Sequence, residues 1–256
     1  MTGPETIHIF HLMRHDGSAL FLHPLRGDQT TFELLENCRI EGLYGAEPEI
    51  ASLTSFRNEL YSLAESALRA WDSQMRFLPR FVLSAALFVV SFLFLSIVVR
   101  DPVPVLDELL ISLALSIAAY VTLRARGRGS ERVERKRITL RTRIDTIVFS
   151  ESSVVQLLEE GLHMHEAEQD AIDALLAERG NPFAEAEGPI VNEVLQYLSL
   201  RFPDRGFRRQ ERRLLRAERG AADQVRQWAT QKSIDLPLFC FYLRLKRALG
   251  SRKVHR

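Results

Sequence analysis

The sequence lacks the motifs by which the common enzyme classes are recognised. It has no GxxxxGK[ST] phosphate loop, no GxGxxG, no HExxH, no GxSxG and no EF-hand loop. Cysteine is scarce as well, because Cys38 and Cys240 are the only two, and they lack the CxxC spacing of a zinc or redox site. We therefore expect no catalytic activity, no disulfide framework, no cofactor and no structural metal.

An excess of charge of one sign is also absent. The chain has 34 Lys and Arg against 33 Asp and Glu, so bulk charge gives no reason to expect a nucleic-acid partner. One basic run, residues 205–219, forms a positive stripe when drawn as a helix, without the aromatic interleaving or the motif of a nucleic-acid reader. The stripe is either a solvated face or a contact with anionic lipid made by Arg208, Arg209, Arg212 and Arg216.

The most informative feature present is an apolar stretch from Phe81 to Leu123. Residues 81–99 carry no charge, and a bilayer core of ~30 Å needs about 20 apolar residues in a helix. A second arm covers residues 103–123, and Pro102 and Pro104 at the junction of the two arms interrupt a helix. We predict a two-helix transmembrane hairpin. A buried hairpin in a soluble core is the alternative, but such cores seldom contain a long run that is apolar on every face.

Arginine residues flank the predicted hairpin on its outer ends, and the short connection between the arms offers only Arg100, beside Asp101. Positive residues near the ends of spans stay on the cytoplasmic side. We expect a multi-pass protein of the cell inner (plasma) membrane with both termini in the cytoplasm. The flanking arginines are Arg69, Arg76, Arg80, Arg124, Arg126, Arg128, Arg132 and Arg135.

Two acids, Asp107 and Glu108, lie near the start of the second arm. An acid at the centre of a span costs ~2.5–3.5 kcal/mol on insertion scales and much less near an interface. We therefore expect both at the outer rim, where two interpretations remain open. Arg100 and Asp101 complete an ion-pair cluster with them, or the four residues form the mouth of a pore in an oligomer.

Before the hairpin, residues 1–48 are expected to be β-rich. Two apolar runs within residues 6–25 flank an Asp-Gly pair, which predicts a β-hairpin. Apolar residues recur at helical spacing over residues 49–80, which predicts an amphipathic helix leading to the membrane. Four histidines fall in the β-hairpin, but strand alternation separates His8 from His11, so we favour paired histidines over a metal site.

After the hairpin, residues 124–256 are expected to form a mainly helical cytoplasmic domain. Residues 138–149 are rich in β-branched side chains, and we predict a strand paired with the N-terminal hairpin; a helix is the alternative. Gly127 and Gly129 weaken a continuous helix and favour the strand. A first helix is expected to start at Ser152 or Ser153. Further helices are expected over residues 166–179, 189–202, 207–229 and 236–249.

The sequence thus predicts a mostly α membrane protein with a mixed α/β cytoplasmic module, built from the N-terminal β-hairpin and the C-terminal helices. Its expected partners are the lipid bilayer and further copies or another membrane protein, because Ser112/Ser116 and Ala114/Ala118 give the spacing at which membrane helices pack. We expect a non-enzymatic anchor that carries an interaction or regulatory module. The alternative is an oligomeric cation channel or transport component.

Overall fold

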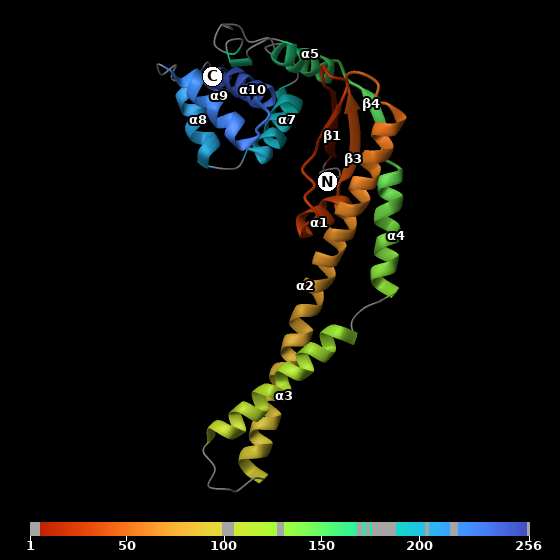
Figure 1. The fold of residues 1–256 in the computed structure, drawn as a ribbon. Helices are drawn as coiled ribbons and strands as arrows, with labels where there is room; N and C mark the ends of the chain where they lie inside the picture. The colour runs from red at the N-terminus through yellow and green to blue at the C-terminus, as the bar shows by residue number, and fades with distance from the viewer. Residues whose placement is uncertain are drawn as a thin grey trace. The chain divides into compact units, whose positions relative to one another are not determined.

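The protein is mostly helical, with one small mixed sheet, in a computed structural model (Figure 1). It divides into two compact units. The head unit consists of Met1–Pro24, Asn37–Asn58 and Thr146–Arg256, and the hairpin unit of Leu25–Glu36 and Glu59–Asp145. The structure describes residues 6–98, 105–126, 131–167, 171–172, 175, 188–202, 205–215 and 220–254.

The sheet of the head unit has the strand order β2-β1-β3-β4. The predicted β-hairpin is confirmed: β1 (Thr6–Met13) pairs antiparallel with β2 (Ala19–Leu22) around a turn in which Gly17 adopts φ 79°. β3 (Arg39–Tyr44) and β4 (Phe149–Glu151) then add in parallel to β1 and β3 respectively. The sheet therefore joins strands from both sides of the apolar stretch.

Parallel neighbours in a sheet require a crossover connection. The first crossover, from β1 to β3, passes through β2 and the short helix α1 (Gln29–Asn37). The second, from β3 to β4, consists of α2 (Ile50–Val98), α3 (Val105–Arg126) and α4 (Glu131–Asp145). The whole apolar stretch is thus an insertion between two adjacent parallel strands.

The predicted strand over residues 138–149 is wrong. Residues up to Asp145 belong to α4, and only the three residues of β4 form a strand, which pairs with β3 and not with the N-terminal hairpin. Leu140 and Ile144 are buried at helical spacing, whereas Ile138 is exposed. Gly127 and Gly129 precede α4, so they do not weaken it.

Strand β3 was not among the individual elements predicted from the sequence. Gly42 pairs with Phe149 across the sheet, and a Cβ atom on it would lie 2.4 Å from the Phe149 ring. Glycine inside a strand often marks such a close approach. The absence of a side chain at Gly42 lets β4 join the sheet.

One hydrophobic core lies between the sheet and the C-terminal helices of the head unit. The sheet contributes Phe10, Leu12 and Leu22, and the helices contribute Leu158, Val194, Phe239 and Phe241, all nearly or fully buried. The two ends of the chain, on either side of the insertion, therefore stabilise each other. The helices are α5 (Ser153–Ala167), α7 (Gly188–Arg201), α8 (Arg205–Leu215), α9 (Ala221–Lys232) and α10 (Leu236–Val254).

The single helix expected over residues 207–229 is wrong. α8 ends at Leu215, and α9 begins at Ala221 after Gly220, whose φ of 72° is left-handed and favours glycine. The start of α10 is confirmed, since Asp235 Oδ1 accepts a hydrogen bond from the backbone N of Leu238 at 3.1 Å. The helix expected over residues 166–179 falls mostly outside the described residues.

Buried acids fix the sheet to α5. Glu159 Oε1 accepts a hydrogen bond from the backbone N of Met13 at 2.8 Å, and burial raises the pKa of its carboxyl group. Glu166 accepts from Arg14 Nε at 2.6 Å and from the backbone N of His15 at 2.7 Å. Hydrogen bonds to buried carboxylates are among the stronger ones, so these acids hold the end of β1 in place.

In the hairpin unit, α1 and α4 pack along the first half of α2. Phe32 of α1 stacks on Trp71 with ring centroids 4.8 Å apart. Arg137 Nε of α4 lies 2.6 Å from Glu65 Oε1 of α2, and the Tyr61 hydroxyl donates to Asp145. The expected amphipathic helix and the first apolar arm form one helix, α2, which continues through Pro79.

Candidate functional site

Beyond Pro79, α2 and α3 carry their large apolar side chains on the outside. Val90 is 63% exposed, Phe94 60% and Ile117 55%. Among the described residues, α2 is the one helix long and apolar enough to cross a membrane. The second span stays a prediction. The other large apolar side chains that are exposed on these parts of α2 and α3 are Phe81, Val82, Leu83, Val89, Leu93, Ile97, Leu109, Leu110, Ile111, Leu113, Leu115 and Val121.

Small polar residues lie where α2 and α3 meet. Ser84 is 6% exposed and Ser112 is fully buried, and the Ser116 hydroxyl donates a hydrogen bond to the backbone O of Ser84 at 2.8 Å. Of the two small-residue pairs noted in the sequence, the serine pair faces α2. Ala114 and Ala118 are exposed on another face of α3, and their role in contacts between copies stays a prediction.

This arrangement reverses the order found in a water-soluble helix pair, where leucine and phenylalanine face the partner helix and polar residues face water. In lipid no hydrophobic effect drives helices together. Helix–helix contacts there depend on small residues, which let the backbones approach, and on interhelical hydrogen bonds. The bond from Ser116 to Ser84 is of this kind. The α2–α3 pair has the pattern expected of helices whose surroundings are apolar.

Replacement of Ser112 by Phe is expected to force α2 and α3 apart. Overpacking a filled contact costs about 1–3 kcal/mol, so we expect the free energy of unfolding in mixed micelles, measured by titration with sodium dodecyl sulfate, to fall by about that amount. Ala114→Phe adds the same bulk on the exposed face of α3 and serves as the matched control. An equal or larger loss for Ala114→Phe would contradict this assignment of the contact face.

The predicted acids lie in the first turn of α3. Asp107 is exposed, whereas Glu108 is half-buried and its Oε2 accepts a hydrogen bond from the Ser96 hydroxyl at 2.8 Å. Carboxylates near a helix N-terminus are stabilised by the helix dipole. Arg100 and Asp101 lie outside the described residues, so their pairing with these acids stays a prediction.

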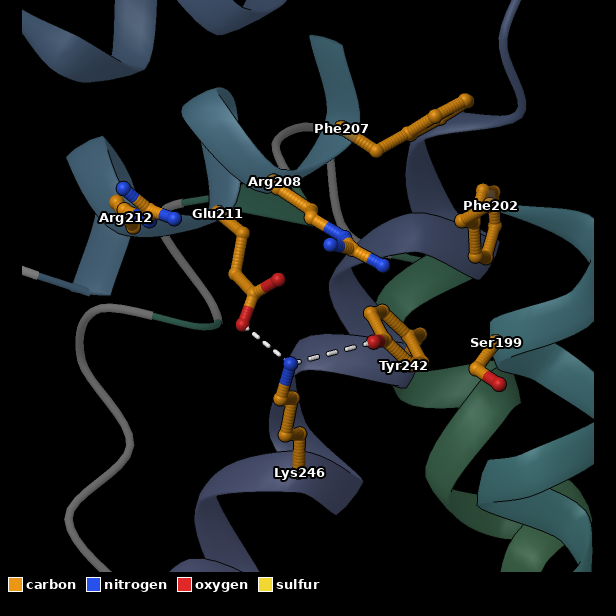
Figure 2. A pocket seen from close by; sticks show the side chains of 8 residues that line it. All are labelled: Ser199, Phe202, Phe207, Arg208, Glu211, Arg212, Tyr242 and Lys246. Carbon is orange, nitrogen blue, oxygen red and sulfur yellow. Dashed lines mark hydrogen bonds and ion pairs between the residues drawn. The ribbon is translucent and has the colours of Figure 1, made fainter. Parts of the chain in front are cut away.

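The predicted basic stripe falls on α8, where Arg208, Arg209 and Arg212 are exposed; Arg216 lies outside the described residues. Arg208 and Arg212, but not Arg209, line a cavity of about 360 Å³ between α7, α8 and α10 (Figure 2). This cavity was not predicted from the sequence. Tyr242 and Lys246 of α10, which also line it, are four residues apart and therefore share a helix face.

Lys246 is held in a defined position at the edge of this cavity. Its Nζ atom lies 2.6 Å from Glu211 Oε1 and donates to the Tyr242 hydroxyl at 3.4 Å. Burial acts to lower the pKa of Lys246, but the hydrogen bond to Glu211 and the further interactions with Tyr242 and Glu211 together outweigh it and raise that pKa. The ammonium group is therefore charged at neutral pH.

The histidines of the β-hairpin each have a different neighbour. His8 Nδ1 lies 2.7 Å from Glu193 Oε2, the buried His11 ring packs against Phe21 at 5.0 Å, and His15 lies 6.1 Å from the ring of His163. Within the described ranges, no group of three or more His, Cys, Asp or Glu side chains is placed to hold a metal ion.

Residues 71–124 match a family of unknown function (DUF6116). The matched segment begins in the middle of α2 and ends near the end of α3, so it covers the apolar α2–α3 pair and none of the sheet or the C-terminal helices. No curated protein and no solved structure matches the chain.

Proposed function

We propose that this protein is a non-enzymatic inner-membrane protein in which α2 and α3 form a transmembrane hairpin. The hairpin anchors the head unit at the cytoplasmic face, where the head unit serves as an interaction or regulatory module. Further copies of the chain or another membrane protein are the partners proposed within the bilayer.

The observation that carries this proposal is the outward position of the apolar side chains on α2 and α3. Burial of apolar surface is worth roughly 25 cal/mol per Å², and soluble monomers rarely expose large contiguous apolar patches. Val90, Phe94 and Ile117 are each more than half exposed, while serines fill the contact between the two helices. Exposure of these apolar side chains is unfavourable in water, whereas their contact with lipid is favourable.

The insertion between β3 and β4 supports a hairpin over a single span. These strands are hydrogen-bonded neighbours in one sheet, so both ends of the inserted segment lie on the same side of any membrane that it enters. A segment with this constraint crosses an even number of times. If α2 crosses the bilayer, α3 is the helix available to return.

The side of the membrane follows from the arginines. Arg69, Arg76 and Arg80 lie on α2 before the exposed apolar region, and Arg124 and Arg126 end α3. Since positive residues near spans remain on the cytoplasmic side, these arginines support a cytoplasmic position for the head unit and both termini.

The second candidate is an oligomeric cation channel. The exposed carboxylate of Asp107 at the start of α3 favours it, because a ring of such acids concentrates cations at a pore mouth. In this case Asp107→Asn together with Glu108→Gln abolishes cation flux in reconstituted vesicles. Wild-type vesicles with no flux above that of empty liposomes would exclude the channel.

Extraction of membranes with alkaline carbonate tests the anchor. We expect the full-length protein to remain in the membrane pellet, as integral proteins do, because its apolar helices lie in the hydrocarbon region. A peripheral protein held by charge is released under the same wash. Release of most of the protein into the supernatant would contradict the proposal.

A further inference from the structure

We infer that the cavity between α7, α8 and α10 of the head unit binds a small organic phosphomonoester. This inference goes beyond the anchoring role and does not depend on membrane insertion, because every residue that carries it belongs to the head unit. The side chains on which the argument rests are Phe202, Phe207, Arg208, Arg212, Tyr242 and Lys246.

The cavity carries an excess of positive charge. Arg208, Arg212 and Lys246 line it together with a single acid, Glu211, which leaves two positive charges. Glu211 pairs with Lys246 at 2.6 Å. In the described part of the chain, neither Arg208 nor Arg212 has a carboxylate partner. A phosphomonoester carries a charge of about −1.5 to −2 at pH 7 and matches this excess.

The donors suit a phosphate group. Figure 2 shows the Arg208 side chain reaching towards Phe202 and Tyr242, with its guanidinium at the cavity. A guanidinium offers a planar fork of N–H donors that binds two phosphate oxygens at once. Because the Tyr242 oxygen accepts from Lys246, the Tyr242 proton is available for donation, and one N–H of the Lys246 ammonium also remains. The Ser199 hydroxyl already donates to the backbone O of Gln196.

Aromatic rings form the remaining wall of the cavity. The ring of Phe202 lies 5.0 Å from that of Phe207 and 5.5 Å from that of Tyr242, measured between centroids. Such a wall accepts a planar or apolar group attached to the phosphate. A cavity of about 360 Å³ lies at the lower end of the range of roughly 300–1,000 Å³ found for small-molecule sites, so the ligand is small.

The test uses the full-length protein in detergent micelles and phenyl phosphate, which combines a phosphomonoester with one aromatic ring. We expect calorimetric titration to detect binding, and inorganic phosphate to bind more weakly because it leaves the aromatic wall empty. Arg208→Gln should weaken binding of phenyl phosphate roughly tenfold or more. Arg208→Lys should reduce the affinity less, because it keeps the positive charge.

Arg209→Gln is the matched control, because Arg209 is exposed on the same helix and does not line the cavity. We expect it to change the affinity less than twofold. Equal losses for Arg208→Gln and Arg209→Gln would mean that the diffuse charge of α8 attracts the anion, and would overturn the inferred site. Unchanged far-UV circular dichroism of the unliganded variants excludes a folding defect.

The same chemistry occurs on a lipid, because phosphatidic acid carries a phosphomonoester headgroup. A second arm therefore measures binding of the protein to nanodiscs with phosphatidic acid and with phosphatidylglycerol, a phosphodiester. Binding that prefers phosphatidic acid and depends on Arg208, without binding of phenyl phosphate, assigns the lipid headgroup as the source. Absence of Arg208-dependent binding in both arms overturns the inference.

Discussion

Val90→Arg is expected to prevent α2 from entering the membrane. Val90 is 63% exposed near the middle of the apolar part of α2, where the proposed hairpin faces lipid. An arginine at the centre of a span costs ~2.5–3.5 kcal/mol on insertion scales, enough to lower the equilibrium constant for insertion more than tenfold. Fractionation of the expressing cells, with the protein quantified in the membrane pellet after a carbonate wash, measures this loss.

Val148→Arg makes the same change at a side chain that is 73% exposed in the head unit, and we expect it to leave membrane localisation intact. If α2 instead faced water, an arginine at Val90 would remove exposed apolar surface and increase solubility without harm. A Val90→Arg protein that is folded, soluble and abundant would therefore contradict the membrane hairpin.

Phe10→Ala is expected to destabilise the sheet and the C-terminal helices of the head unit together. Phe10 of β1 is fully buried, and its ring lies 5.9 Å from that of Tyr197 on α7. Truncation of a buried phenylalanine to alanine costs about 3–5 kcal/mol through lost burial and the cavity left behind. Hydrogen exchange of the detergent-solubilised protein should show faster exchange in β3 and in α10 alike.

Leu157→Ala is the control for this experiment. Leu157 lies on α5 of the same unit but is 41% exposed, so we expect a change of at most about 0.5 kcal/mol. Faster exchange confined to β1 and β2 in Phe10→Ala would mean that the sheet and the helices have separate cores. That result would contradict a head unit built from both ends of the chain.

The sequence predicted elements whose signals are local. The Asp16-Gly17 turn identified the β1–β2 hairpin, and the helix predicted over residues 236–249 starts where α10 starts. Elements that depend on contacts distant in sequence were missed. Gly42 lies in β3, where it pairs with Ile9 of β1 and with Phe149 of β4, and residues 138–145 form a helix in which Leu140 and Ile144 are buried at helical spacing.

The candidate sites, too, could be predicted only where their signals are local in the sequence. The apolar stretch and its serines were visible in the sequence, but periodicity did not decide which face of α3 meets α2. The contact uses Ser112 and Ser116 and leaves Ala114 exposed. The cavity could not be predicted, because Arg208 and Lys246 are 38 residues apart and are brought together by the packing of α8 on α10.

Thiol labelling across the membrane tests the hairpin most directly. In a background without Cys38 and Cys240, one variant carries Val103→Cys at the junction of the two arms and another carries Leu157→Cys in the head unit. With right-side-out vesicles and an impermeant maleimide, the account predicts labelling of Val103→Cys without lysis and of Leu157→Cys only after lysis. Labelling of both variants from the same side would contradict a hairpin that crosses the membrane.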